Sequence, residues 1–473
     1  MVENPVRFGT DGWRAIIADT FTFENVRACA QATAEHFAEV EGTGKPLIVG
    51  WDTRFLSEDF AFDVARVLAA NGFAVELADR PAPTPALSWR VIEAGAGGGV
   101  MVTSSHNPAK WNGIKIKPHY GGSAGPAVVA DIERRVPALI DDPSRVKYAP
   151  RDAAGIRRFD PLPGYLGALR HKVDCDRIRS AGLKIAHDAM FGTGAGLLDA
   201  LVGGGTTRIE NLHAERNPSF PGLRAPEPID SNLGDLLERT GGGPFDIGLA
   251  NDGDADRLGV VDERGAYVDQ LRTFALLVNY LLGPRGLRGA VVKSVTTTDM
   301  ARILAAHYEV DCIETPVGFK HIGPVMMERD ALIGGEESGG YGFRGHLPER
   351  DGILAALYLL DYLAASGRRP SELVEDVFAV TGPHFYRRID IELEPGSNAA
   401  IAERLNTAAP DRIAGCAVTS ADRTDGWRFM LDEGWLLFRL SGTEPLLRIY
   451  TEVRNEALVG PLLEEGRALV AAG

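Results

Sequence analysis

Short apolar runs recur along the chain, and each is followed by a segment whose apolar residues have helical spacing. Three such pairs are residues 46–51 with 59–68, 183–187 with 194–201, and 290–295 with 298–307. Strands that alternate with helices in this way are typical of α/β units built around mixed sheets. We therefore predict an α/β fold for most of the chain.

Linkers rich in glycine and proline interrupt the alternating strands and helices near residues 142–163, just after Asp256, and near residues 380–383. A chain of 473 residues also exceeds what one hydrophobic core usually organises. We predict three related α/β domains with mixed sheets over residues 1–155, 156–256 and 257–380, and a smaller α+β domain over 381–473.

The composition is ordinary for a globular protein, with 45% hydrophobic and 24% charged residues. No apolar run approaches the roughly 20 residues that a membrane helix needs, and the N-terminus lacks the apolar core of a signal peptide. The four cysteines, Cys29, Cys175, Cys312 and Cys416, show no CxxC spacing. We expect buried thiols in a reducing compartment, which predicts a cytoplasmic protein.

The formal net charge of −15 narrows the possible partners. A negative field disfavours nucleic acid and anionic membranes, which bind basic surfaces, so we expect neither as a partner. The same field repels phosphorylated metabolites. A site for a phosphate would therefore need its own arginines, lysines, backbone N–H groups and a metal ion. The oligomeric state stays open.

Residues 103–108, Thr-Ser-Ser-His-Asn-Pro, follow a glycine-rich run. Glycines let a backbone approach a ligand closely, and Pro108 fixes the exit from the turn. A serine in such a loop can carry a phosphoryl group if nearby charges stabilise the transfer. His106 and Lys115 offer a proton carrier and a cation. An ordinary Ser/Asn turn with a helix cap explains the hexapeptide alone equally well.

Asp252, Asp254 and Asp256 alternate directly after the apolar run 247–250. Where a strand ends in a loop, three such carboxylates can converge on one hard cation. No glutamate stands at the twelfth position of an EF-hand loop, so Mg²⁺ with a phosphate in its shell fits better than Ca²⁺. Without a cation the carboxylates would repel one another, which favours a metal site over an acidic surface turn.

Two later loops carry groups suited to a sugar phosphate. Glu336 and Ser338 offer an acceptor and a donor for sugar hydroxyls, although an ordinary turn explains them equally well. In residues 439–445, Arg-Leu-Ser-Gly-Thr-Glu-Pro, and in Arg448, hydroxyls, guanidiniums and a glycine backbone can form an anion cradle. Because the apolar run 435–438 precedes it, we expect a strand-to-helix loop, and a capped helix start would look the same.

Three glycine turns complete the set. Residues 8–14 present Arg14 and residues 317–321 present Lys320, and either turn could be ordinary surface. Residues 192–196 miss the GxGxxG spacing, and no GxxxxGK[ST] segment exists. We therefore predict a strand-to-helix turn there and no nucleotide site.

Together, these motifs resemble the α-D-phosphohexomutase family, which includes phosphoglucomutase, phosphomannomutase and phosphoglucosamine mutase, and they follow its order from Phe8 to Arg448. The resemblance implies four domains around a central cleft. It implies a magnesium-dependent isomerase of carbohydrate metabolism, a phosphoprotein that interconverts hexose 1-phosphate and hexose 6-phosphate. Hexose 1,6-bisphosphate would be its intermediate and activator, and small-molecule hexose phosphates its partners.

The resemblance also implies roles for single residues. The serine before His-Asn-Pro is the family's phosphoryl carrier, which implies Ser105, with His106, Lys115 and Arg14 as its helpers. One Mg²⁺ would be held by Asp252, Asp254, Asp256 and Ser105. The implied substrate-binding residues are Lys320, Glu336, Ser338, Arg350, Arg439, Ser441, Gly442, Thr443 and Arg448, supported by Arg257 and His346.

Gly340 departs from many bacterial members, in which a histidine at this place moves protons. Residues 345–352 are similar to the corresponding stretch of phosphoglucomutases, some of which also lack that histidine. The general acid or base is therefore left open between His106, Lys115 and His346. Arg350 stays charged and can act only electrostatically.

The turn around Lys320 and the glycine at 340 resemble phosphoglucomutases more than phosphomannomutases, whereas the motifs at 8–12 and 439–445 also occur in phosphoglucosamine mutases. Glucose phosphate is our first expectation, mannose phosphate the second and glucosamine phosphate the third. Two other classes stay open. A phosphatase with Asp252 as nucleophile leaves the Ser105 loop and the cradle unexplained, and a silent sugar-phosphate binding protein would not need the three aspartates.

Overall fold

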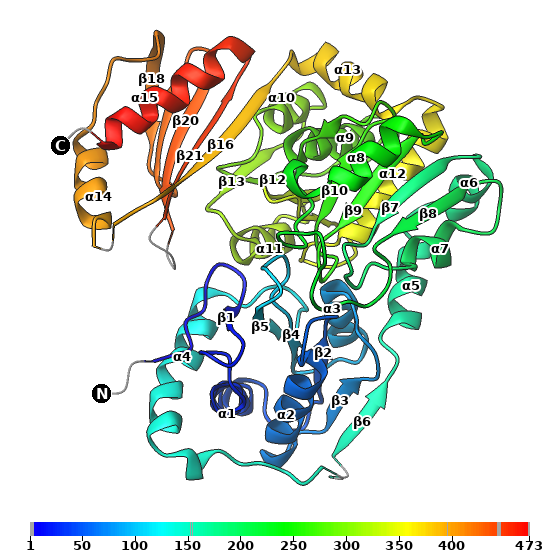
Figure 1. Cartoon of the computed structure of the whole chain (residues 1–473), viewed down its shortest axis with the longest axis vertical. Coiled ribbons are helices and arrows are strands. Elements are labelled where there is room, and N and C mark those ends of the chain that lie inside the picture. Colours follow the sequence, from blue (N-terminus) through cyan, green and yellow to red (C-terminus); the bar gives the residue numbers. More distant parts are fainter. Residues whose placement is uncertain (1–3, 152, 154, 395, 442–445, 472–473) are drawn as a thin grey trace.

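The computed structural model describes residues 4–151, 153, 155–394, 396–441 and 446–471, which form four sheets in succession along the chain. Figure 1 shows the N-terminal sheet (blue) in the lower half, the second and third sheets above it, and the C-terminal sheet (orange to red) at the upper left. We call the corresponding parts of the chain domains I to IV. The predicted class, three α/β domains and a C-terminal α+β domain, is confirmed.

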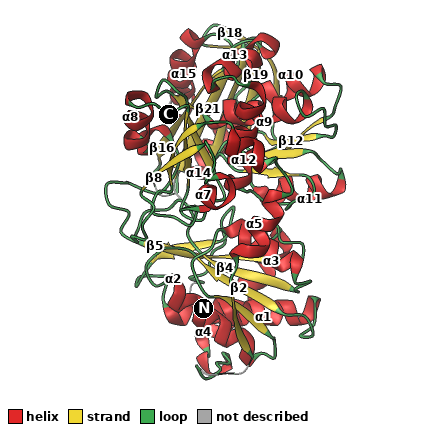
Figure 2. Cartoon of the chain, turned by 90° about the vertical axis from the view of Figure 1, so that its right-hand side faces the viewer, coloured by secondary structure: helices red, strands yellow, loops and turns green. Residues whose placement is uncertain are grey.

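Domain I is a six-stranded mixed sheet between helices (Figure 2). Its strand order is β1 (Trp13–Ile16), β5 (Trp111–Pro118), β4 (Gly98–Val102), β2 (Leu47–Trp51), β3 (Val75–Ala78) and β6 (Ile156–Phe159). Helices α1 (Phe23–Val40), α2 (Ser57–Ala70) and α4 (Pro126–Asp141) cover one face, and α3 (Thr84–Glu93) covers the other. Both faces are therefore buried, which explains why β2 is apolar at nearly every position.

Domains II and III share one hydrophobic core. The sheet of domain II has the order β11 (Tyr267–Val268), β10 (Leu258–Val261), β9 (Ile247–Asn251), β7 (Lys184–Asp188) and β8 (Arg208–Leu212), and that of domain III the order β13 (Cys312–Thr315), β12 (Val291–Ser294), β14 (Ile333–Gly335) and β15 (Tyr341–Phe343). Helix α12 (Gly352–Ser366) is apolar on nearly all sides because it packs between elements of both domains.

The other helices of these two domains surround the sheets (Figure 1). They are α5 (Leu162–Arg170), α6 (Cys175–Ser180), α7 (Leu197–Val202), α8 (Gly234–Gly242), α9 (Gln270–Leu282), α10 (Met300–His307), α11 (Phe319–Glu328) and α13 (Pro370–Thr381). Three short 3₁₀ turns span Pro143–Arg145, Asp230–Asn232 and Glu456–Leu458. The turn at residues 192–196 leads from β7 into α7, as predicted.

Domain IV is an antiparallel sheet with helices on one face. Its strand order is β16 (Phe385–Glu392), β21 (Leu446–Val453), β20 (Gly434–Leu440), β19 (Trp427–Leu431), β18 (Cys416–Asp422) and β17 (Arg412–Ile413), and its helices are α14 (Asn398–Thr407) and α15 (Val459–Ala471). Leu436 and Phe438 of β20 pack against these helices. Trp435 and Leu437, on the opposite face, pack with Val295 of domain III.

The structure differs from the sequence-based expectations at two domain boundaries and after Pro445. Strand β6 follows the proposed boundary at 155 but pairs with β3, and β10 and β11 follow the boundary at 256 but extend the sheet of domain II. The helix expected after Pro445 is wrong, because β21 follows and pairs antiparallel with β20. The phosphate motif therefore begins within β20, and the next described residue after Ser441 is Leu446, the first residue of β21.

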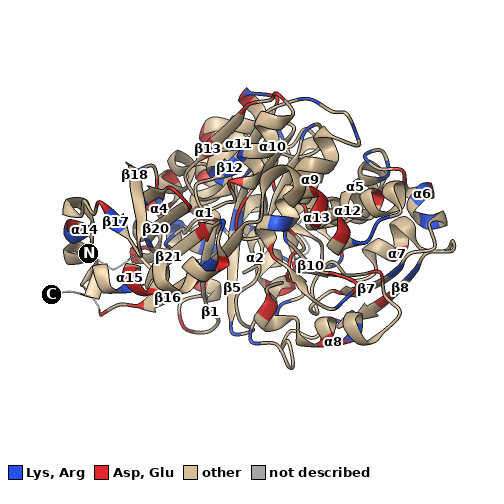
Figure 3. Cartoon of the chain, turned by 90° about the horizontal axis from the view of Figure 1, so that it is seen from above, with Lys and Arg blue, Asp and Glu red and all other residues tan. Residues whose placement is uncertain are grey.

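No helix among the described residues has the length and apolar character needed to cross a bilayer. The four cysteines are free thiols; Cys29, Cys175 and Cys416 are buried, and Cys312 is partly exposed. Acidic and basic residues are interspersed over the domains (Figure 3).

Candidate active site

Ser105 lies in the loop between β4 and β5, where two domains meet. Its hydroxyl donates to Asp252 Oδ2 of domain II at 2.7 Å, and its backbone N–H donates to Thr103 Oγ1 at 2.9 Å. The residue is buried and has a φ of 50°, a left-handed conformation that costs a non-glycine residue about 1–3 kcal/mol. Surrounding contacts must therefore hold the loop in this shape.

Arg54, which we did not select from the sequence, provides those contacts. Its fully buried guanidinium pairs with Asp52 at 3.3 Å, and Asp52 also accepts from the hydroxyl of Thr103 at 2.6 Å. The guanidinium donates to the backbone carbonyls of Ser105, Asn107, Pro108 and Trp111, at 2.5–3.1 Å. One side chain thus binds four backbone carbonyls of the serine loop and stabilises its conformation. An arginine three residues after a buried strand was the only sign of this in the sequence.

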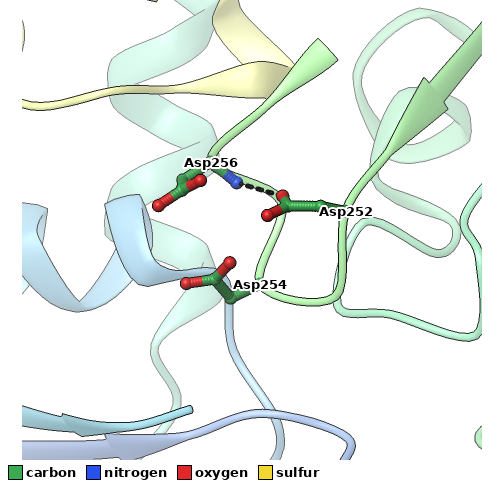
Figure 4. Close-up of side chains that lie close together, drawn as sticks. All are labelled: Asp252, Asp254 and Asp256. Atoms are coloured by element: carbon green, nitrogen blue, oxygen red, sulfur yellow. Dashed lines mark hydrogen bonds between the residues drawn. The ribbon is translucent and has the colours of Figure 1, made fainter. Parts of the chain in front are cut away.

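Asp252, Asp254 and Asp256 converge after β9 (Figure 4). Each offers a carboxylate oxygen, and these atoms lie within 4.8 Å of one another. Asp252 Oδ1 accepts the backbone N–H of Asp256 at 3.0 Å, whereas Oδ1 of Asp254 and Oδ1 of Asp256 are buried and have no hydrogen-bond partner among the residues that the structure describes. Burial, together with the neighbouring carboxylates, raises the pKa of Asp252 well above its ordinary value. Oxygen ligands, unpaired acceptors and mutual repulsion all fit a hard cation such as Mg²⁺.

Lys115 on β5 binds the same cluster from domain I. Its Nζ lies 2.8 Å from Asp254 Oδ2, 2.7 Å from Asp256 Oδ2 and 2.8 Å from Asp11 Oδ2. Burial alone would lower the pKa of Lys115, but these three carboxylates outweigh it and raise the pKa above its ordinary value. The ammonium group therefore stays charged, which suits charge neutralisation and not proton abstraction.

Arg350 brings domain III to this cluster. Its guanidinium pairs with Asp256 at 2.9 Å, with Glu336 at 3.4 Å, and with Asp11. A Cβ at Gly340 would lie 2.1 Å from Cδ of Arg350. The side chain of Arg350 therefore occupies the space that any side chain at 340 would need, which explains the glycine at this position. Asp11, which lies in the motif at 8–14 but was not selected there, links Lys115 and Arg350.

His106 and His346 have different surroundings. Nδ1 of His106 is 3.3 Å from Ser105 Oγ, and burial together with the charges of Arg257 and Arg14 lowers the pKa of His106 well below its ordinary value. His346 is buried, stacks on Trp89 with ring centroids 5.5 Å apart, and pairs with Asp351 at 2.7 Å. Asp351 caps the N-terminus of α12, so His346 supports that helix start.

The remaining predicted residues of domains I to III have the following surroundings. Arg14 donates to Asn107 Oδ1 in the serine loop at 3.1 Å. Arg257 lies 3.9 Å from both Asp252 and Asp256. Glu336 is buried, which raises its pKa, and the Ser338 hydroxyl is buried with no hydrogen-bond partner in the described part of the chain. Lys320, at the start of α11, lines a small pocket with Asp11 and Lys115.

The phosphate motif lies in domain IV. Arg439 on β20 and Arg448 on β21 are directly opposite in the antiparallel ladder. Arg439 Nε donates to both carboxylate oxygens of Asp425, at 3.1 and 3.0 Å, and Arg448 pairs with Asp390 at 3.7 Å. Ser441 is buried, and Gly442 and Thr443 lie outside the described residues.

Comparison with known proteins adds independent information. Four family models described as phosphoglucomutase/phosphomannomutase match: domain I at residues 5–141, domain II at 163–265, domain III at 269–380 and the C-terminal domain at 397–468. A phosphoglucomutase/phosphomannomutase from Thermococcus kodakarensis is 30% identical over 464 residues, with 98% of each chain covered. A phosphoglucosamine mutase from Clavibacter sepedonicus is 30% identical over 479 residues, also covering 98% of each. A crystal structure from Thermus thermophilus, provisionally named a phosphomannomutase, matches with a TM-score of 0.86 at 36% identity, covering 98% of this chain and 99% of the other.

Proposed function

Because the chain belongs to the phosphoglucomutase/phosphomannomutase family, and is thus an isomerase that transfers a phosphoryl group, we propose that it interconverts hexose 1-phosphate and hexose 6-phosphate through phospho-Ser105 and a hexose 1,6-bisphosphate. The family membership confirms the resemblance seen in the sequence. The observation that carries the proposal is the 2.7 Å contact between the Ser105 hydroxyl and Asp252. It joins a strained, buried serine to a cluster of three carboxylates.

In this mechanism the bond between Ser105 Oγ and phosphorus breaks, and a bond from a sugar hydroxyl oxygen to phosphorus forms. The sugar hydroxyl loses a proton and Ser105 Oγ gains one. Nδ1 of His106 is 3.3 Å from Oγ, which places the ring within reach of the proton that Oγ gains. Burial and the charges of Arg257 and Arg14 lower the pKa of His106, which favours the neutral ring. Lys115 and Arg350 stay charged and stabilise the negative charge of the transferring group.

Asp252, Asp254 and Asp256 would hold one Mg²⁺ beside the phosphoserine, where it would offset the charge of the phosphoryl oxygens. Glu336 and Ser338 would bind sugar hydroxyls, which fits the burial of Glu336 and the buried Ser338 hydroxyl, which has no partner among the described residues. Arg439, Ser441 and Arg448 of domain IV, with Gly442 and Thr443, would bind the phosphate that is not transferred. The bisphosphate must then turn end for end, so these residues must accept either phosphate.

The nature of the hexose is a second question, because relatives named for glucose or mannose and for glucosamine are equally similar, at 30% identity. We propose glucose phosphate first, mannose phosphate second and glucosamine phosphate as the alternative. Parallel kinetics on the three hexose 1-phosphates, with the matching bisphosphate as activator, would rank them. A glucosamine phosphate preferred by tenfold or more would overturn this order.

The proposed phosphoserine is tested by intact and peptide mass spectrometry of the purified protein. We expect one phosphate adduct, and we expect it on Ser105. The neighbouring Ser104 is buried as well, so it serves as an internal comparison. Phosphate on Ser104 would contradict Ser105 as the carrier. Release of inorganic phosphate from the substrate in place of isomerisation would contradict the mutase and favour a phosphatase with Asp252 as nucleophile. Sugar-phosphate binding without any adduct would favour a silent binding protein.

A further inference from the structure

A carboxylate of domain IV, Asp425, contacts both Arg439 on β20 and the backbone of the turn before Lys320 in domain III. It lies in the turn between β18 and β19. Gly426, with a φ of 95°, lets that turn approach β20 closely, since a Cβ there would lie 2.2 Å from the carbonyl oxygen of Phe438. The turn therefore places Asp425 beside the next residue of β20, Arg439, whose Nε donates to both carboxylate oxygens at 3.1 and 3.0 Å.

The same carboxylate reaches across the boundary to domain III. Asp425 Oδ2 accepts the backbone N–H of Val317 at 2.8 Å. Val317 begins the turn that leads through Gly318 into α11, where Lys320 stands in the first turn. One carboxylate thus binds the guanidinium of Arg439 and the backbone of the Lys320 turn at once.

The pattern of β20 explains why Arg439 meets domain III. Alternate residues of a strand share a face, and Trp435 and Leu437 on this face pack with Val295 of domain III. Arg439 continues the same row at the rim of that apolar contact. Its direction is therefore fixed by the sheet, and Asp425 fixes the rotation of its guanidinium.

The charges around Asp425 belong to both domains. Burial lowers the pKa of His321, the charges of Lys320 and Arg439 lower it further, and the carboxylate of Asp425 opposes them. These groups therefore lie within electrostatic reach of one another. Asp425 screens the repulsion between the basic groups. Asp425 accepts only the Nε–H of Arg439, and among the described residues no acceptor is seen for the terminal nitrogens of the guanidinium, which can therefore donate to a phosphate.

We propose that Asp425 is a positioning residue that holds Arg439 and the Lys320 turn as one composite anion site shared by domains III and IV. The inference rests on the proposed function, since it deepens the role given there to Arg439 and adds Lys320 to the same site. It extends that role by making the two domains bind the non-transferring phosphate together. Asp425 itself would not touch the substrate.

The first test is Asp425→Asn, which keeps the shape of the side chain and removes its charge. We expect KM for both hexose monophosphates to rise roughly tenfold, with kcat within about threefold of the wild type, because the contact binds substrate and transition state alike. The phosphate content of Ser105 should not change. The conservative Asp425→Glu should recover part of the loss and serves as the second variant if the asparagine variant folds poorly.

A double-mutant cycle separates positioning from general loss of structure. If Asp425 acts through Arg439, Asp425→Asn should change the affinity less than twofold in an Arg439→Ala background. The matched control is Asp422→Asn, three residues earlier, whose carboxylate pairs with Arg428 at 2.9 Å and has no recorded contact with Arg439 among the described residues. The control should change KM less than twofold. Multiplicative losses for Asp425 and Arg439, or equal losses in Asp422→Asn, would overturn the proposal.

A binding readout keeps this test apart from the proposed function. Calorimetry of hexose 6-phosphate binding to Ser105→Ala protein, with and without Asp425→Asn, requires no turnover. We expect the dissociation constant to rise roughly tenfold. Absence of mutase activity in the wild type would reject the proposed function alone. An unchanged dissociation constant would reject the role of Asp425 alone.

Discussion

The surroundings of Ser105 and those of Arg439 are built differently. Around Ser105, ion pairs join domains I, II and III, and the side chains of Lys115, Asp11 and Arg350 are 2%, 9% and 4% exposed. Around Arg439, that residue and Asp425 are 17% and 21% exposed, and Arg448 and Asp390 are 24% and 38% exposed. The recorded contacts of Asp425 and of its neighbour Arg428 outside domain IV run to domain III.

This difference matches two different demands. Phosphoryl transfer depends on fixed in-line geometry and on charges placed before the reaction, which buried and mutually paired groups provide. The proposed phosphate cradle must instead receive two different phosphates in turn. A partly exposed group of arginines paired with carboxylates can release and rebind a ligand without disrupting the catalytic cluster.

The largest expected effect is at Ser105. Ser105→Ala should reduce turnover roughly 10⁴-fold or more, since no other group can carry the phosphoryl at that place. Ser104→Ala, the matched control, should leave turnover within about threefold. Steady-state assays in both directions measure this. Equal losses in the two variants would show that Ser105 is not the specific phosphoryl carrier of this loop.

The next effect concerns the carboxylate cluster. Chelation of Mg²⁺ should stop catalysis, and Asp254→Asn should weaken Mg²⁺ binding at least about tenfold in calorimetry, because the triad loses one of three anionic ligands. Asp235→Asn, an exposed change in the same domain, is the control. Full turnover in excess chelator would show that the metal is not needed for the reaction.

At the other end of the comparison, Arg439→Ala should cost about 1.5–3 kcal/mol of phosphate binding, the usual worth of a charge-assisted hydrogen bond. That equals roughly one to two decades in affinity. The loss should be similar for the 1-phosphate, the 6-phosphate and the bisphosphate, and phosphoserine content should persist. Arg412→Ala, an exposed arginine of the same domain, is the control. A loss confined to one monophosphate would show that the cradle is not shared.

The two regions also differ in how far the sequence predicts them. The run before Asp252 predicts a strand that ends in a loop, and β9 confirms this because alternation and burial are local properties. The helix expected after Pro445 is wrong, since a Ser/Thr-Gly turn can precede either a helix or a hairpin strand, and pairing with β20 decides for β21.

Other residues could not be found from sequence because their partners are distant in the chain. Arg54 binds the carbonyl of Ser105, 51 residues away, and Asp425 binds a backbone N–H 108 residues away. Arg350 was predicted from the resemblance, but only the structure shows that it needs a glycine at 340, because a side chain there would occupy its space. The periodicity of apolar residues indicates which face of a helix or strand is buried, but it does not indicate which distant residues that face contacts.

The smallest expected effect concerns the contact that holds domain IV to domain III. Glu314 of domain III pairs with Arg428 of domain IV at 2.7 Å and with the buried Lys293 at 2.6 Å. Burial would raise the pKa of Glu314, but Arg428 and Lys293 outweigh it and lower the pKa from 4.5 to about 2. A carboxyl group whose pKa is lower in the folded than in the unfolded state stabilises the folded protein at pH values above the unfolded pKa. That stabilisation is lost as pH falls from about 4.5 to about 2.

Glu314→Gln should therefore lower the stability of this interface by about 1–2 kcal/mol near neutral pH, a value reduced for solvent screening because the Glu314 side chain is 32% exposed. The difference from the wild type should shrink as pH falls below about 4.5 and vanish near about pH 2. Urea unfolding followed by hydrogen exchange in β12 and β19 measures it locally. Glu328→Gln, an exposed change in α11, should show no pH-dependent difference. A difference that stays constant over this whole pH range would mean that Glu314 contributes by packing and not by charge. The ion pairs of Glu314 would then not stabilise the contact between domains III and IV.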